Sequence, residues 1–142
     1  MKKPFLIIFF ATIIGLLLYE HYQSNYFQLI DGDWQITKAY HNSDNLQDDQ
    51  YVIVGFFEKP DQLWLVKNKP GKDNEHVYAN YKLYKSLDTL RLKITKCSDN
   101  RFNKNFNLYL DTIENSDNQF LIRLTLDSEN TFIQAIKPKI RY

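Results

Sequence analysis

Cysteine, glycine and proline are scarce in this chain of 142 residues, which has one Cys, four Gly and four Pro. A single cysteine excludes an internal disulfide framework and any zinc site built from several cysteines. Low glycine and proline together with 15% aromatic residues argue against a disordered chain and for a packed core. We expect one domain with a short appendage, because the chain is too short for two ordinary domains.

An excess of charge of either sign is also lacking, since 18 Lys and Arg face 17 Asp and Glu. The basic residues are dispersed, so no nucleic acid partner is expected. The sequence has no P-loop, dinucleotide fingerprint or nucleophile elbow. His21, His41 and His76 share no metal-ligand spacing, and Cys97 has no neighbouring histidine to activate it. We therefore predict neither an enzyme nor a metal or cofactor site.

The N-terminus carries the pattern of an export signal. Lys2 and Lys3 precede an uncharged run, Pro4–Tyr19, which ends at Glu20. As a helix this run spans roughly 24 Å, short of the ~30 Å hydrocarbon core, so its length suits a signal peptide or an anchor. No A-x-A-like cleavage site follows it, and Cys97 lies too far downstream to be a lipoprotein cysteine. We predict an uncleaved transmembrane helix, with a cleaved signal peptide as the alternative.

Lysines on one side of this run predict its orientation. Lys2 and Lys3 precede the run and the next lysine is Lys38, which places the N-terminus in the cytoplasm. We therefore expect a single-pass cytoplasmic-membrane protein whose domain lies outside the cytoplasm, in the periplasm of a Gram-negative cell.

Three tyrosines extend the apolar run. Tyr19, Tyr22 and Tyr26 would share one face of a continuing helix, as an interfacial belt or as ordinary aromatic residues of a linker. We assign 1–27 to a signal anchor with an interfacial extension, and 28–142 to an exported β domain.

Period-two alternation dominates the chain from Gly32 onward. Eight strands are predicted, at residues 33–40, 51–57, 63–67, 75–85, 87–96, 106–113, 119–126 and 131–137. In the first strand, one face carries Trp34, Ile36, Lys38 and Tyr40. Gly55 in the second indicates a bulge or bend. Short polar connectors favour antiparallel neighbours, so we predict an all-β fold, a single eight-stranded antiparallel up-and-down barrel, with a sandwich as the alternative.

The segment Gly32-Asp33-Trp34, which opens the first strand, resembles the G-x-W motif of the lipocalins and related calycins. This resemblance implies that Trp34 plugs the closed end of a barrel. It also implies that a basic residue near the last strand packs across the indole, either Arg141 or Arg123, a contact worth about 0.5–2 kcal/mol. The family's Thr-Asp-x-Tyr motif has no counterpart here, and the C-terminal Arg-Tyr lacks the Arg-x-Tyr spacing of fatty-acid-binding relatives. The resemblance therefore implies a fold but no ligand.

Two functions fit such a tethered barrel. In the first, the barrel binds a small apolar or lipid-like molecule in its interior, and the predicted lining residues are Tyr40, Phe56, Tyr81 and Phe106. Alternatively, it is a protein-interaction module of the cell envelope, an assembly or protective partner, whose barrel is filled by its own side chains. The interior of eight strands is only just wide enough for side chains, so the many aromatic residues favour filling. An internal cavity or a filled core would separate the two.

Overall fold

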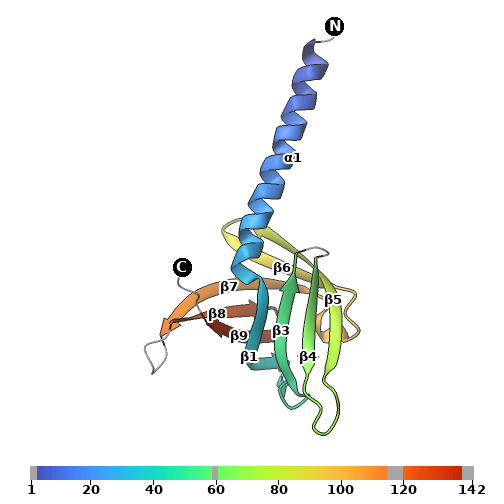
Figure 1. The fold of residues 1–142 in the computed structure, drawn as a ribbon, viewed down its shortest axis with the longest axis vertical. Helices are drawn as coiled ribbons and strands as arrows, with labels where there is room; N and C mark the ends of the chain where they lie inside the picture. Colours follow the sequence, from blue (N-terminus) through green and yellow to red (C-terminus); the bar gives the residue numbers. More distant parts are fainter. Residues whose placement is uncertain (1–2, 59–60, 115–119, 139–142) are drawn as a thin grey trace. The chain divides into compact units, whose positions relative to one another are not determined.

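A computed structural model describes residues 3–58, 61–114 and 120–138. The chain divides into two compact units, Met1–Ile30 and Asp31–Tyr142. The first unit contains one helix, α1 (Lys3–Ile30), and the second contains the strands (Figure 1).

Helix α1 exposes the apolar side chains of its middle part. Every described side chain from Ile8 to Tyr19 is exposed. In the part of the chain that the structure describes, however, no helix is both long enough and apolar enough to cross a bilayer. The predicted transmembrane helix is therefore not supported, because the uncharged run is short and α1 continues past it through polar residues to Ile30. The side chains of Tyr22 and Tyr26 lie outside the described residues.

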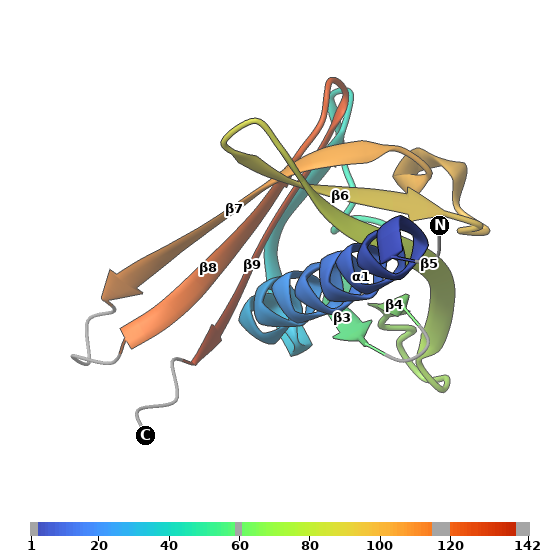
Figure 2. The same ribbon diagram turned by 90° about the horizontal axis from the view of Figure 1, so that it is seen from above.

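The second unit is an antiparallel β-barrel. Its elements are β1 (Gly32–His41), β2 (Asp44–Asn45), β3 (Tyr51–Phe57), β4 (Gln62–Lys67), β5 (Glu75–Ser86), β6 (Thr89–Thr95), η1 (Asn100–Phe102), β7 (Asn105–Glu114), β8 (Phe120–Asp127) and β9 (Thr131–Pro138). Each long strand pairs with the next, and β9 pairs with β1, which closes the sheet (Figure 2). The two-residue β2 adds to the end of β1. The predicted eight-stranded antiparallel barrel is confirmed, and the sandwich is excluded.

The strand prediction fails at the tip of one hairpin. Leu87 was expected in a strand, but it forms the turn between β5 and β6, with φ at 55° and 93% of its surface exposed. Ser86 pairs with Thr89, which leaves a two-residue turn. Turns of this length require a positive φ that favours Gly, Asn or Asp, so an apolar Leu conceals the turn in the sequence.

The predicted faces of β1 are wrong after Ile36. The pairing of β1 with β9 shifts between Ile36 and Lys38, which marks a β-bulge. The extra residue reverses the alternation, so Ala39 is buried with Trp34 and Ile36 while Lys38 and Tyr40 are exposed.

Gly55 does not form the predicted bulge or bend; it leaves room for the side chain of Trp64. The register shift in the pairing of β3 with β4 lies between Tyr51 and Ile53. At Gly55 the indole of Trp64 covers the backbone: an added Cβ would lie 2.1 Å from Trp64 Cζ2 and 2.5 Å from Asp33 Oδ1. Only glycine permits this close approach.

Large side chains fill the inside of the barrel. They come from every long strand and are buried: Trp34, Phe56, Leu63, Leu65, Tyr81, Leu92, Phe106, Leu124, Leu126 and Ile133. Interdigitated residues of this size suit an eight-stranded barrel, whose interior is about as wide as its side chains.

Candidate functional site

The two ends of the barrel differ in chemistry. We call the end where β1 begins and β9 ends the tryptophan end, and the end where β1 ends and β9 begins the polar end. Trp34 is fully buried at the first, and Gly32 precedes it with φ at 87°, a region that glycine adopts without strain. The predicted burial of Trp34 is thereby confirmed.

A lysine, and neither predicted arginine, covers the indole of Trp34. Lys137 Nζ lies 4.3 Å from the centre of the ring and donates a hydrogen bond of 2.7 Å to the carbonyl of Asp31. Burial lowers the pKa of Lys137, and the carboxylate of Asp31 opposes this. Arg123 instead forms an ion pair with Asp111, and Arg141 lies outside the described residues.

Strand alternation explains why Lys137, and not Arg123, covers the indole of Trp34. Ile133 and Ala135 are buried inside the barrel, and Lys137 follows them on the same face of β9. Arg123 neighbours the buried Leu124 and therefore faces outward, away from the indole.

The structure brings together two of the four residues predicted to line a ligand cavity. The rings of Phe56 and Tyr81 lie 5.5 Å apart at 89°, and the Tyr81 hydroxyl donates to the carbonyl of Phe57 at 2.8 Å. Phe106 is also inside, whereas Tyr40 is 39% exposed. Phe56 and Phe106 are completely buried, so the surrounding side chains fill the space next to both rings. Ligand binding by these residues stays a prediction.

A groove lies beside the first residues of β1, and we call it the seam groove. Strand β1 pairs with β3 from Gly32 to Gln35 and with β9 from Gln35 to His41, so each edge of β1 is paired with these strands over only part of its length. The groove has a volume of about 450 Å³. Its lining consists of Asp33, Trp34, Gln35, Val52, Ile53, Leu121, Ile136, Lys137 and Pro138. The sequence does not predict this groove, because its position depends on where β1 changes partners.

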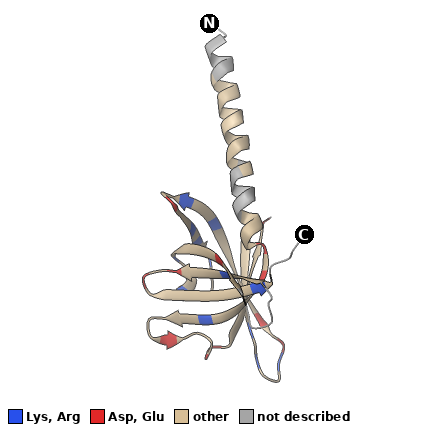
Figure 3. Ribbon diagram, turned by 90° about the vertical axis from the view of Figure 1, so that its left-hand side faces the viewer, with Lys and Arg blue, Asp and Glu red and all other residues tan. Residues whose placement is uncertain are grey.

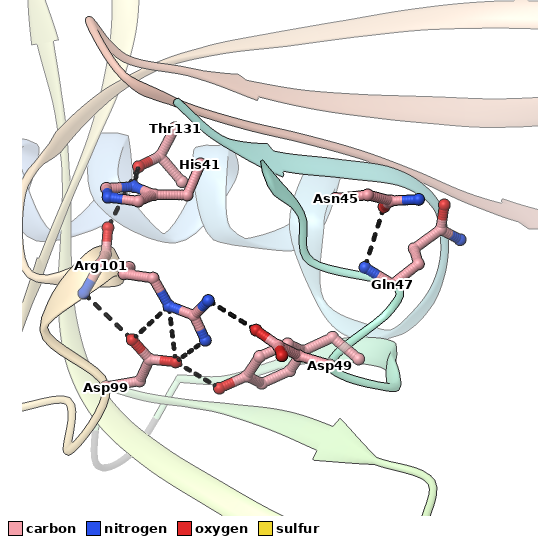
Figure 4. Close-up of polar contacts among 8 residues, drawn as sticks. His41, Asn45, Gln47, Asp49, Asp99, Arg101 and Thr131 are labelled. Carbon is pink, nitrogen blue, oxygen red and sulfur yellow. Dashed lines mark hydrogen bonds and ion pairs between the residues drawn. The ribbon is translucent and has the colours of Figure 1, made fainter. Parts of the chain in front are cut away.

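The polar end is held by a half-buried carboxylate, Asp99 (Figure 4). Asp99 accepts hydrogen bonds from the Tyr51 hydroxyl and from Arg101 Nη2, each at 2.6 Å, and Arg101 Nη1 donates to Asp49 at 2.6 Å. Burial by itself would raise the pKa of Asp99, but the hydrogen bonds from Arg101 and Tyr51 outweigh it and lower the pKa to about 2. Burial and Asp99 together raise the pKa of Tyr51.

Thr131 joins three elements beside this network (Figure 4). Its hydroxyl lies 2.8 Å from His41 Nδ1, accepts a bond of 2.9 Å from Lys104 Nζ and donates to the Arg101 carbonyl at 3.2 Å. Burial lowers the pKa of Lys104. Thr131 is 1% exposed, so these polar groups contact one another and fasten β1, η1 and β9 together.

Asp99 and Arg101 lie between the predicted strands 87–96 and 106–113 and were not predicted as site residues. A signal was present, because Asp99 caps the short helix η1 and accepts from the Arg101 backbone N–H at 3.1 Å. Asp is a preferred cap at a helix N-terminus.

Charges of both signs are interspersed on the barrel in the view of Figure 3. No protein-family model matches the sequence, and no curated protein matches it. The likeness to the lipocalins therefore rests on Gly32-Asp33-Trp34 and on the eight-stranded closed barrel.

Proposed function

We propose that this protein is a membrane-tethered, noncatalytic binding protein that takes a small apolar or lipid-like ligand in the seam groove. The groove itself carries this proposal: its volume of about 450 Å³ lies within the ~300–1,000 Å³ typical of small-molecule sites. Its walls are mainly apolar, with few polar groups, as such sites require. The packing around Phe56 and Phe106 favours the groove over the barrel interior.

The groove's charges define the ligand further. Ile53, Leu121 and Ile136 supply apolar contact, while the carboxylate of Asp33 and the ammonium of Lys137 provide opposite charges. Because these two charges balance, the groove suits an apolar body with a neutral or zwitterionic polar group.

Binding is tested by native mass spectrometry of the full chain after gentle extraction from its membranes. Ile136→Asp places a charge among the apolar walls and should weaken lipid binding by about tenfold or more, which corresponds to ~1.4 kcal/mol. Tyr78→Asp is the matched control, because Tyr78 is 51% exposed and does not line the groove. Equal lipid retention by both variants would remove the groove from the proposal.

The tether is proposed from α1. Apolar side chains from Ile8 to Tyr19 are exposed, with Lys2 and Lys3 before them and Glu20 after them. Exposed apolar surface of this extent favours a lipid environment, and the flanking lysines favour a cytoplasmic N-terminus and an extracytoplasmic barrel. We expect the intact chain in the membrane fraction. A mature N-terminus located after Tyr19 would exclude the tether.

An envelope interaction module is the second candidate, favoured by exposed aromatic rings. Phe57 and Tyr78 are 49% and 51% exposed, and the centroids of Phe57 and Trp64 lie 3.9 Å apart. Aromatic residues are enriched where proteins bind each other. Co-purification of a stoichiometric protein, without lipid, that is lost in Tyr78→Asp but kept in Ile136→Asp would support this candidate over the first. Substrate turnover abolished by a single polar substitution would overturn both.

A further inference from the structure

Strand β7 has an edge that no other strand of the described chain accompanies along its full length. Its pairing with β6 ends at Leu108, which faces Leu90, whereas its pairing with β8 continues to Glu114. Among the described residues, no strand therefore lies beside 109–114 on the β6 side. Figure 2 shows β7 continuing past β6 beside β8.

The pairing pattern identifies which backbone groups face that edge. The N–H of Ile94 in β6 donates to the carbonyl of Lys104, just before β7. The backbone N–H and C=O groups of the even-numbered residues of β7 therefore face β6. Hydrogen-bonding groups alternate along an antiparallel strand. The N–H and C=O groups of Leu110, Thr112 and Glu114 consequently point to the free edge, while the odd-numbered residues pair with β8.

Two other edges of the barrel carry features that discourage further pairing. On β9, beyond its last pair with β1 at Ile136, Pro138 lacks an N–H. The part of β5 that continues past its last pair with β4 at Asn80 carries Lys82 and Lys85. Proline and lysine are common protections of sheet edges. The residues of β7 from 109 to 114 include neither, so this edge remains open to an added strand.

We propose that β7 pairs with β7 of a second copy of this chain, antiparallel, about a two-fold axis at Thr112. In this register Thr112 pairs with Thr112 of the second copy, and Leu110 pairs with Glu114 of the second copy. Every edge-facing backbone group from 110 to 114 then has a partner, which no other symmetric register achieves. The sheets join as β9-β8-β7 from each copy.

The side chains are compatible with this register. Asp111 lies opposite Ile113 of the second copy, and it is already paired with Arg123, so like charges do not meet. On the inner face, half-buried Leu110 and Ile122 gain cover. Because β7 runs in opposite directions in the two copies, β6 of the second copy comes beyond Glu114 and not alongside the free edge. The inference goes beyond the proposed function and depends on the backbone pairing alone.

Disulfide formation tests the register in cells that express the full chain. Directly opposed, hydrogen-bonded residues have Cα atoms about 5.5 Å apart, within the ~4.4–6.8 Å range of disulfides. With the buried Cys97 replaced by Ser, Thr112→Cys should form a covalent dimer on mild oxidation. Tyr78→Cys, 51% exposed on another strand, should form no covalent dimer. Equal dimer yields in the two variants would overturn the proposal.

A second pair of variants separates backbone pairing from side-chain contact. Thr112→Pro removes an N–H that faces the free edge and leaves the hydrogen bonds to β8 intact, whereas Thr112→Val keeps the N–H. Light scattering of the purified full chain should show a dimer for Thr112→Val and loss of the dimer for Thr112→Pro. A dimer that persists in a folded Thr112→Pro variant would overturn the inference. Ile136→Asp should leave the dimer unchanged, which distinguishes failure of this interface from failure of the groove.

Discussion

The two ends of the barrel are stabilised by different interactions. At the polar end, Asp99 binds Tyr51 and Arg101 through hydrogen bonds that depend on its charge. At the tryptophan end, Trp34 is buried by close packing, and the ammonium group of Lys137 lies over its ring. The stability of the polar end therefore depends on the protonation state of a carboxylate, and that of the tryptophan end depends mainly on packing.

Pairing also differs between the ends. Near the polar end β1 pairs with β9 up to His41, and the loop that contains η1 is bound to both the Thr131 region and Tyr51. Toward the tryptophan end, β9 extends beyond its last residue paired with β1, and β7 extends beyond its last residue paired with β6. The seam groove and the free edge both follow from this incomplete pairing. We propose that the binding surfaces lie toward the tryptophan end, where pairing is incomplete, whereas hydrogen bonds and pairing close the polar end.

Trp34→Ala should give the largest effect. Removing a fully buried tryptophan costs about 3–5 kcal/mol of unfolding free energy, because the surrounding side chains cannot fill the space. Lys137→Met is the control, since it keeps an apolar chain against the indole and removes the cation–π contact, worth about 0.5–2 kcal/mol, together with the hydrogen bond to the Asp31 carbonyl. Chemical denaturation of the full chain measures both. A Trp34→Ala variant as stable as the parent would refute the contrast between the ends.

Gly55→Ala tests the close packing of the Trp64 indole against the backbone of β3. The new Cβ would lie 2.1 Å from Trp64 Cζ2, so the indole must move, at a cost of about 1–3 kcal/mol. In a Trp64→Ala background the same change should cost much less. A double-mutant cycle of unfolding free energies measures the coupling, and additive effects would show that the contact between Gly55 and Trp64 contributes nothing.

Asp99→Asn tests the polar end through pH. The folded pKa of Asp99 is about 2 against an ordinary value of 3.8, so between these values the unfolded chain binds more protons. The stabilisation is present above about pH 4 and lost as the pH falls toward 2. At neutral pH, Asp99→Asn should cost about 1–3 kcal/mol, because charge-assisted hydrogen bonds are weakened.

Unfolding measured from pH 7 to 2 should therefore show a smaller dependence in Asp99→Asn than in the parent. Asp111→Asn is the control for this experiment, because its ion pair with Arg123 is exposed and should contribute little. An unchanged pH profile in Asp99→Asn would show that the polar end does not depend on this carboxylate.

Leu87→Asn should have the smallest effect, a gain in stability. Leu87 adopts a φ of 55° with 93% of its surface exposed, and Asn tolerates this conformation better by about 0.5–1 kcal/mol. Leu87→Ala removes the same exposed apolar surface without relieving the backbone, so it should not stabilise. Thermal unfolding of the three proteins compares them, and equal gains from Ala and Asn would exclude backbone strain as the cause.

Most of the fold was predictable because local patterns determine it. Alternation in segments such as 106–113 and 131–137 indicates strands, and polar connectors indicate antiparallel neighbours. The predicted strand order and the burial of Trp34 are both confirmed. The interior position of Phe56, Tyr81 and Phe106 also follows from alternation, although it does not by itself make a ligand site.

The candidate sites were not predictable, because they depend on register between distant segments. The bulge after Ile36 turns Tyr40 outward, and only the pairing of β1 with β9 reveals it. The groove exists because β1 changes partners at Gln35, and Trp34 meets Lys137 because β9 closes the barrel.

By itself, the sequence determined the class of the domain, the number and order of its main strands, and the apolar character of its N-terminal run. These properties follow from periodicity and composition, which act over a few neighbouring residues. The tertiary structure alone decided which cation covers Trp34, where the groove lies and which edge of β7 is left unpaired. Those features arise where residues far apart in the chain meet in one register, and a shift of one residue would reverse the faces of a whole strand.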